Sequence, residues 1–106
     1  MITIVATFAV PEANRERFVE LGRRLVAGSL AEVGNVSYQF VVSREDAGAF
    51  AFVEGWADAA AIDAHNASEH GQVYRKSRDA GYTRNYESMY KQLKKLKNYE
   101  KPKKIS

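Results

Sequence analysis

Apolar and polar residues alternate along three short stretches of the chain, a period-two pattern that is typical of β-strands. Residues 2–9 have one wholly apolar face and one face of small mixed residues, which predicts a strand covered on both sides. A second alternating run covers residues 36–42, and a third, richer in aromatic residues, covers 50–56. Residues 44–48 are largely polar and end in glycine, so they fit a hairpin loop of about five residues between these two strands.

The segment after the first strand has a helical pattern. Pro11 suits the start of a helix, since its fixed φ matches the first turn and its missing N–H costs nothing there. Glu12 and Glu16 follow, near the positive end of the helix dipole. We expect an amphipathic helix over residues 12–27, whose apolar stripe is made by Phe18, Leu21 and Leu25.

The third strand leads into a second predicted helix. Asp58 is a good N-cap for the Ala-rich segment that follows, and we expect this helix to continue to about Asp79 with a kink near Ser68. Residues 82–96 fit both a helical stripe and a strand, and local pattern alone does not decide between them. We predict a strand over residues 83–91, because it completes a βαββαβ order, and a frayed or helical remainder.

This order of elements predicts an α+β fold of the ferredoxin-like βαββαβ type. A chain of 106 residues matches one domain, and no repeat or Pro/Gly/Ser-rich stretch divides it. We expect a domain over residues 1–91 and a Lys-rich C-terminal tail over residues 92–106. Because a domain of this size buries only about two-thirds of its unfolded surface, a second chain covering a sheet face would help appreciably.

The composition excludes several classes of site. The chain contains no cysteine, which removes disulfides, thiolate metal sites, iron–sulfur clusters and thiol nucleophiles. Its first residues lack a basic region and a long apolar run, and no segment approaches the roughly 20 apolar residues that a membrane helix needs. We therefore expect a cytoplasmic protein without membrane contact.

Charge is unevenly distributed along the chain. Residues 1–90 carry nine Lys or Arg against twelve Asp or Glu, whereas residues 91–106 carry seven Lys against one Glu. A Lys run of this kind attracts phosphate, and so raises the question of nucleic-acid binding. A solvated terminus explains the same residues more simply, and we do not expect a nucleic-acid partner.

One stretch combines unusual residues at fixed spacing. An apolar strand ends in Glu-x-Trp, an acidic residue follows two positions later, and the next helix carries His-x-x-Ser-x-His. The residues at these positions are Glu54, Trp56, Asp58, His65, Ser68 and His70. This pattern resembles the antibiotic biosynthesis monooxygenase family. Residues 4–25 and the turn at 32–38 are also similar, although Val33 and Asn35 replace the family's usual Pro and Cys, and the resemblance covers about residues 1–80.

The resemblance implies a ferredoxin-like protomer whose sheet packs against that of a second protomer in a dimeric α+β barrel. The helices would cover the other face, with a small pocket between sheet and helices. The family includes cofactor-free oxygenases of phenolic or quinol-like substrates, haem-degrading proteins and small isomerases, so the fold alone does not give the function. Haem degradation fits least well, because that branch uses an Asn on the first strand where this chain has Thr7.

His65 is the first candidate for chemistry, since a neutral imidazole is the commonest general base. It lies three residues after Ile62, so the two side chains share the side of the helix that should face the sheet. It would either deprotonate an aromatic hydroxy compound, whose anion reacts with dioxygen, or be a capping or core histidine. His70 lies five residues further on and does not share a helix face well with His65, so we predict no metal site.

The remaining candidates would shape the substrate site. Trp56 could stack on a flat aromatic ring or belong to the core, and Asn66 could bond a substrate oxygen or face solvent. Glu54 shares a strand face with Trp56, where it would act as acid or base or, more simply, form a structural ion pair. Tyr38, Phe40 and Tyr74 could line the cavity or belong to an aromatic-rich dimer core. His70 could line the cavity entrance or simply shape the turn.

These observations support three functions of different kinds. The leading hypothesis is a homodimeric, cofactor-independent monooxygenase of small quinol or polyphenol-like compounds, with dioxygen as the second substrate and His65 as base. An isomerase or epimerase of a small phosphorylated or keto sugar would use the same histidine to move a proton without oxygen. A non-enzymatic, dimeric ligand-binding or stress-related protein would hold an apolar metabolite without turnover.

Overall fold

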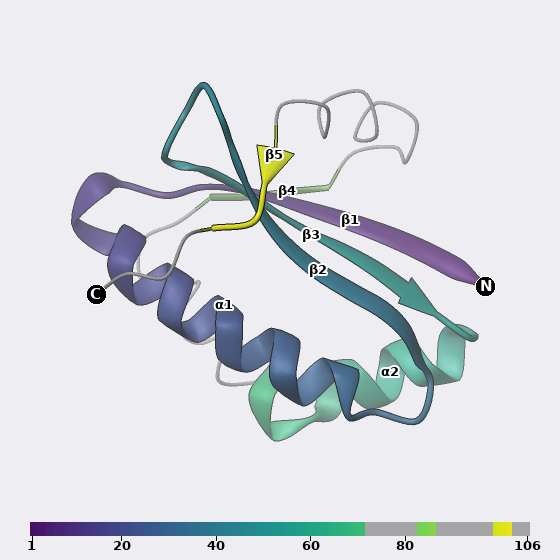
Figure 1. The fold of residues 1–106 in the computed structure, drawn as a ribbon. Helices are drawn as coiled ribbons and strands as arrows, with labels where there is room; N and C mark the ends of the chain where they lie inside the picture. The colour runs from purple at the N-terminus through teal and green to yellow at the C-terminus, as the bar shows by residue number, and fades with distance from the viewer. Residues whose placement is uncertain (72–82, 87–98, 103–106) are drawn as a thin grey trace.

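The computed structural model of this protein describes residues 1–71, 83–86 and 99–102. These residues form two α-helices and five strands, and each α-helix lies between two strands in the sequence (Figure 1). The elements are β1 (Ile2–Ala9), a short 3-10 turn η1 (Glu12–Asn14), α1 (Arg15–Leu30), β2 (Asn35–Ser43), β3 (Ala49–Trp56), α2 (Ala59–Ala67), β4 (Thr83–Tyr86) and β5 (Tyr99–Glu100). No helix in the described ranges is long and apolar enough to cross a membrane.

The strands form one antiparallel sheet in the order β4-β1-β3-β2-β5. β1 and β3 pair along their whole length, from Ile2 opposite Trp56 to Ala9 opposite Ala49. β2 and β3 form the predicted hairpin around residues 44–48. The first four strands therefore have the 4-1-3-2 order of the ferredoxin-like fold, which confirms the predicted α+β class.

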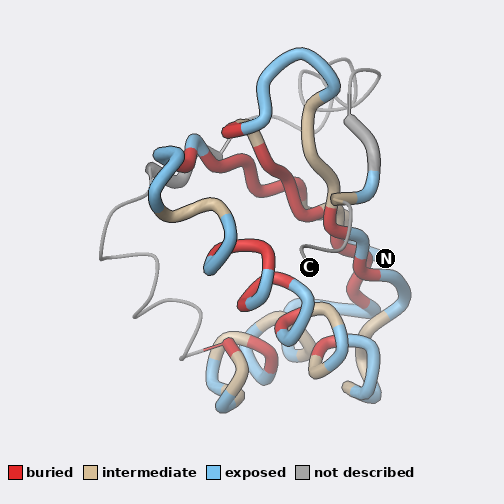
Figure 2. The backbone as a smooth tube through the Cα atoms, turned by 60° about the vertical axis from the view of Figure 1, so that its left-hand side comes forward, coloured by how far each residue is buried: buried red, intermediate tan, exposed pale blue. Residues whose placement is uncertain are grey.

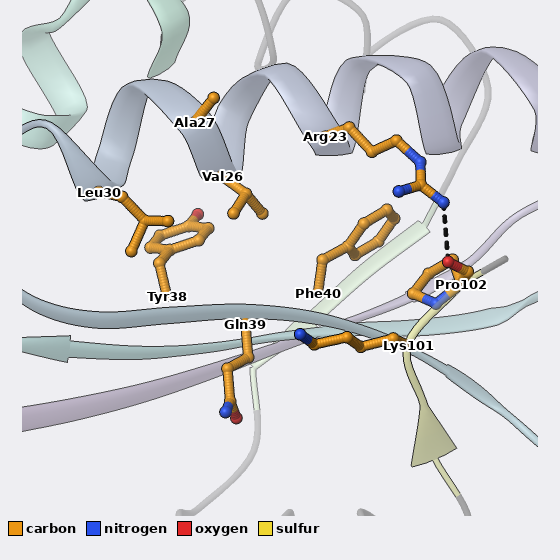
Figure 3. A pocket seen from close by; sticks show the side chains of 9 residues that line it. All are labelled: Arg23, Val26, Ala27, Leu30, Tyr38, Gln39, Phe40, Lys101 and Pro102. Carbon is orange, nitrogen blue, oxygen red and sulfur yellow. Dashed lines mark hydrogen bonds between the residues drawn. The ribbon is translucent and has the colours of Figure 1, made fainter. Parts of the chain in front are cut away.

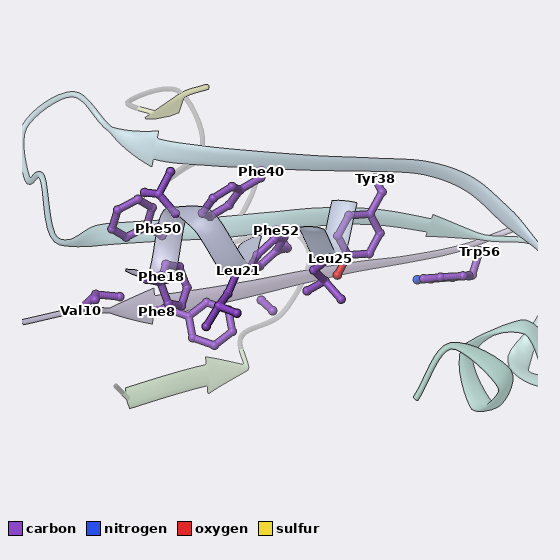
Figure 4. Packing of buried hydrophobic residues seen from close by; sticks show 12 residues of the cluster. Phe8, Val10, Phe18, Leu21, Leu25, Tyr38, Phe40, Phe50, Phe52 and Trp56 are labelled. Carbon is purple, nitrogen blue, oxygen red and sulfur yellow. The ribbon is translucent and has the colours of Figure 1, made fainter. Parts of the chain in front are cut away.

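Both helices cover the same face of the sheet, and an aromatic core fills the space between them and the strands (Figures 1 and 4). Phe18 of α1 is fully buried at the centre of this core. Its ring centroid lies between 5.0 and 6.3 Å from those of Phe8, Phe40, Phe50 and Phe52. The apolar stripe predicted for the first helix is thus the surface that joins α1 to the sheet.

The central strands are buried on both faces, as the pattern of residues 2–9 predicts. Figure 2 shows long buried stretches in β1 and β3, whereas buried and exposed residues alternate along α1. Val5 and Thr7 project from the face of β1 opposite to Ala6 and Phe8, since successive side chains of a strand alternate. They are nevertheless only 4% and 8% exposed.

α1 differs from its predicted bounds at both ends. The first turn after Pro11 is a 3-10 turn, and the α-helix begins only at Arg15. The helix then passes through Gly28 and ends at Leu30, three residues later than predicted. The hydroxyl of Ser29 donates to the carbonyl oxygen of Leu25 at 2.6 Å and stays buried, so the last turn is held in place.

α2 begins and bends where the sequence predicts. The carboxylate of Asp58 accepts a hydrogen bond from the N–H of Ala61 at 2.8 Å, which makes it the N-cap. The helix ends at Ala67, because Ser68 takes an extended conformation with ψ at 156°. Residues 72–79 of the predicted helix lie outside the described residues.

The C-terminal part confirms one prediction and corrects another. β4 pairs with β1 over residues 83–86, as expected for the final strand, and residues 87–91 lie outside the described part. The tail was expected to be frayed or helical throughout, but Tyr99 and Glu100 form β5, a short antiparallel partner of β2. The free edge of β2 explains this pairing, because an unpaired strand edge offers hydrogen-bonding groups to any nearby chain segment.

Candidate active site

His65 is buried where α2 meets the sheet. The residue is 7% exposed, and its ring centroid lies 4.5 Å from that of Trp56 and 5.6 Å from that of Tyr38. Its Nδ1 atom lies 2.9 Å from Oε1 of Glu32. Since a carboxylate oxygen only accepts, the ring donates its N–H to Glu32, and this bond fixes the orientation of the imidazole.

Glu32 lies in the turn after α1 and contacts both histidines of the chain. Nε2 of His70 lies at hydrogen-bonding distance from the same Oε1 atom that His65 contacts. The side chains of Glu32 and His70 are 18% and 25% exposed, so solvent reaches this end of the group. We refer to Glu32, His65 and His70 as the Glu32 cluster.

The two histidines meet because the chain bends between them. The ring centroids of His65 and His70 are 5.7 Å apart, although helix spacing predicted that they would not share a face. That expectation is wrong because it assumed a continuous helix, whereas Ser68 breaks α2. The N–H and hydroxyl of Ser68 both donate to the carbonyl oxygen of His65. Spacing along a helix is therefore no reason to exclude a site that both rings share.

Two glycines make room for this arrangement. A side chain on Gly71 would place its Cβ 2.5 Å from the carbonyl oxygen of His65, so the turn after Ser68 closes tightly only with glycine. A Cβ on Gly28 of α1 would lie 2.6 Å from ring atoms of His70. The imidazole of His70 thus packs directly on the backbone of α1, beside Glu32.

Trp56 forms the inner wall of the site. It is fully buried, and its indole N–H donates to Oε1 of Glu54 at 3.0 Å. Glu54 is 5% exposed and projects from the same face of β3, as the strand alternation predicts. The indole N–H therefore serves a protein carboxylate, while the stacking of Trp56 on a substrate and the ion pair of Glu54 stay predictions.

A cavity of about 410 Å³ lies between α1 and β2 (Figure 3), and His65 and Trp56 are not among the residues that line it. Its volume is in the range of small-molecule sites. Tyr38 and Phe40 point into it from β2, and α1 contributes apolar side chains. The residues that line it are Arg23, Val26, Ala27, Leu30, Tyr38, Gln39, Phe40, Lys101 and Pro102. Tyr38 joins the cavity to the Glu32 cluster, because its ring also packs against His65.

Three further residues predicted to bind the substrate are not among the described residues that line the cavity. Asn66 follows His65 on α2 and is half-buried, and within the described residues no hydrogen bond links it to the Glu32 cluster. Tyr74 lies outside the described residues. His70 is not among the residues that line the cavity between α1 and β2. Glu32 is not among the site residues predicted from the sequence. The feature that points to it is its place at the start of residues 32–38, the stretch that resembles the family's turn and second strand.

The comparison with known families agrees with this geometry. Residues 1–77 match the family model described as antibiotic biosynthesis monooxygenase. The chain belongs to this family. The matched range contains the Glu-x-Trp strand, Glu32 and both histidines. All three residues of the Glu32 cluster therefore lie in the antibiotic biosynthesis monooxygenase domain.

Relatives of this antibiotic biosynthesis monooxygenase domain are found among both sequences and structures. A Bacillus subtilis protein named "Putative monooxygenase YcnE" is 35% identical over 74 residues, which cover 70% of this chain and 78% of that one. A structure titled antibiotic biosynthesis monooxygenase superposes with a TM-score of 0.73 at 27% identity, over 83% of this chain and 97% of that one. A conserved Bacteroides thetaiotaomicron protein of unknown function gives 0.76 at 27% identity, over 80% and 90% of the two chains.

Proposed function

We propose that this protein is a cofactor-independent monooxygenase of small aromatic hydroxy compounds of the quinol or polyphenol class. The observation that carries the proposal is the buried imidazole of His65, held by the carboxylate of Glu32. Because Nδ1 donates to Glu32, Nε2 is the atom that takes a proton from the substrate. The carboxylate then stabilises the imidazolium that forms, as the aspartate does in a Ser-His-Asp triad.

The surroundings of His65 suit a flat aromatic substrate. Trp56 and Tyr38 present aromatic rings beside the imidazole, and aromatic rings favour offset or edge-to-face packing with one another. The cavity next to Tyr38 is mainly apolar, and Arg23 and Lys101 add positive charge at one end. A phenolic compound with an anionic or strongly polar group matches this combination of an apolar wall and two cations.

The proposed reaction needs no cofactor, because the substrate itself supplies the two electrons that reduce the second oxygen atom of dioxygen to water. His65 removes a proton, and the electron-rich anion passes one electron to dioxygen. The two radicals combine to form a carbon–oxygen bond, and the peroxide receives the proton back from His65. Its O–O bond then breaks, so that one oxygen atom stays on the oxidised substrate and the other leaves as water. For a substrate AH₂ the sum is AH₂ + O₂ → AO + H₂O.

Oxygen consumption by metal-stripped, flavin-free protein with a panel of hydroquinones and anthrones tests this proposal. Glu32→Gln is expected to lower kcat by about 10²–10⁴-fold, since a neutral amide no longer stabilises the imidazolium. The matched control is Glu69→Gln, which makes the same charge change at an exposed residue and should keep wild-type rates. Equal rates in the wild type and Glu32→Gln would contradict the role of Glu32.

The same panel separates the other two functions. Turnover under nitrogen at the aerobic rate would identify an isomerase or epimerase, because such proton transfers consume no oxygen. Tight binding of an aromatic compound, without turnover in air, would identify a ligand-binding protein. Either result would replace the monooxygenase proposal.

We also propose that the protein is a homodimer whose protomers pack through the sheet face away from α1 and α2. The outer face of β1 supports this, because its residues Thr3, Val5 and Thr7 are small and only partly polar, whereas an antiparallel sheet that faces water on one side usually has a polar outer face. Sedimentation equilibrium is expected to give twice the chain mass of 11.9 kDa. A mass of one chain at micromolar concentration would contradict the dimer.

A further inference from the structure

We propose that Glu32, His65 and His70 form a binding site for a divalent transition-metal ion, with Zn²⁺ as the best match. The two histidines of the chain contact one carboxylate oxygen, and the three candidate ligand atoms all lie within 4.8 Å of one another. Two imidazole nitrogens and one carboxylate oxygen are a common protein ligand set for Zn²⁺ at sites that keep an open position.

One pair of these atoms already lies close to the separation that an ion needs. Zinc bonds to imidazole and carboxylate are roughly 2.0–2.2 Å long, so ligand atoms around a tetrahedral ion lie about 3.4 Å apart. Nδ1 of His65 and Oε1 of Glu32 are 2.9 Å apart and would have to separate only slightly. Because Glu32 and His70 are partly exposed, an ion can enter and a water molecule can take the fourth position.

Separate parts of the fold hold the ligands in place. Glu32 comes from the turn after α1, and His65 comes from α2, where Trp56 packs on its ring. His70 comes from the segment after Ser68, and the bare backbone at Gly28 lets its ring lie against α1. Supporting contacts of this kind orient the ligands before the ion arrives, so the side chains lose less conformational entropy when the ion binds.

Metal binding is a property separate from the proposed reaction, and a bound ion would inhibit that reaction. An ion on Nδ1 of His65 takes the place of the proton that this atom donates to Glu32, and the neutral ring then carries its one proton on Nε2 instead. The imidazole can no longer accept a proton from a substrate. An occupied site therefore stops turnover, and removal of the ion restores it.

Zinc titration of the metal-stripped full-length protein tests the inference, with calorimetry for the affinity and imidazole NMR signals for the site. We expect one Zn²⁺ per chain and shifts of both histidine rings. Glu32→Gln and His70→Ala should each weaken binding by at least about tenfold, since even outer partners of a metal site contribute roughly 10–100-fold. Glu69→Gln is the matched charge control and should bind like the wild type.

Gly28→Ala gives a second variant that keeps all three ligands. The added methyl group would push against the His70 ring, so zinc affinity should fall while the circular dichroism spectrum stays native. No stoichiometric zinc binding by the wild type, or equal affinity in Glu32→Gln and His70→Ala, would overturn the inference. Oxygen consumption without zinc binding overturns the metal site alone, whereas zinc binding without oxygen consumption overturns only the proposed function.

Discussion

Replacement of His65 by glutamine is expected to lower kcat for oxygen-dependent turnover by about 10²–10⁴-fold, the usual contribution of a general base. The amide cannot take up the substrate proton, while the walls made by Trp56 and Tyr38 stay in place. KM should therefore change little, because an interaction made only on the way to the transition state is lost. Stopped-flow or oxygen-electrode kinetics in air measure both constants.

The control for this variant lies on the same helix. Asp63 is exposed on α2, so Asp63→Asn should leave kcat and KM at wild-type values. Near-ultraviolet circular dichroism of Trp56 reports whether the ring environment around residue 65 is intact in each variant. A His65→Gln protein with native dichroism and wild-type kcat would show that another group is the base.

Phe18→Ala is expected to lower the free energy of unfolding by about 3–5 kcal/mol, the range for large-to-small changes of buried aromatic residues. Phe18 is fully buried and packs against four other phenylalanine rings at the centre of the core (Figure 4). Its loss leaves a cavity between α1 and the sheet that the surrounding rings cannot fill. For a domain with a stability of about 5–15 kcal/mol, this is a large part of the total.

Urea unfolding measures this change as a shift of the midpoint at unchanged slope. The neighbouring Arg17 is exposed, so Arg17→Ala should stay within about 0.5 kcal/mol of the wild type. Phe18→Leu keeps much of the apolar volume and should fall between the two. A Phe18→Ala variant as stable as Arg17→Ala would contradict the position of Phe18 at the centre of the core.

The strands and the first helix could be predicted because their patterns are local. The alternation over 50–56 places Trp56 and Glu54 on one face, and Asp58 caps the helix that follows. The end of α1 could not be read in the same way. Glycine often marks a helix end, but α1 continues through Gly28 to Leu30, and the missing side chain at Gly28 leaves room for the His70 ring.

The Glu32 cluster could be predicted only in part. His65 was expected on the face that looks toward the sheet, and it is buried there. Its partner Glu32 is 33 positions away in the chain, and only the packing of α2 beside the end of α1 brings the two together. His70 joins them through the break at Ser68, which no helical spacing rule includes. Contacts that depend on tertiary packing are thus the part that local patterns cannot give.

The β5 strand shows the same limit at the other end of the chain. Tyr99 and Glu100 lie in a Lys-rich segment without the alternation that predicts a strand. They pair with Val42 and Ser43 because the edge of β2 is available to them.

Incubation of metal-stripped protein with an anthrone or hydroquinone under ¹⁸O₂, followed by mass spectrometry of the product, tests the proposed function most directly. The proposed reaction predicts one labelled oxygen atom in the product, with a rate that falls in His65→Gln and Glu32→Gln and stays constant in Glu69→Gln. A product that carries no label, or one that forms as fast under nitrogen, would contradict a monooxygenase that uses His65 as its base.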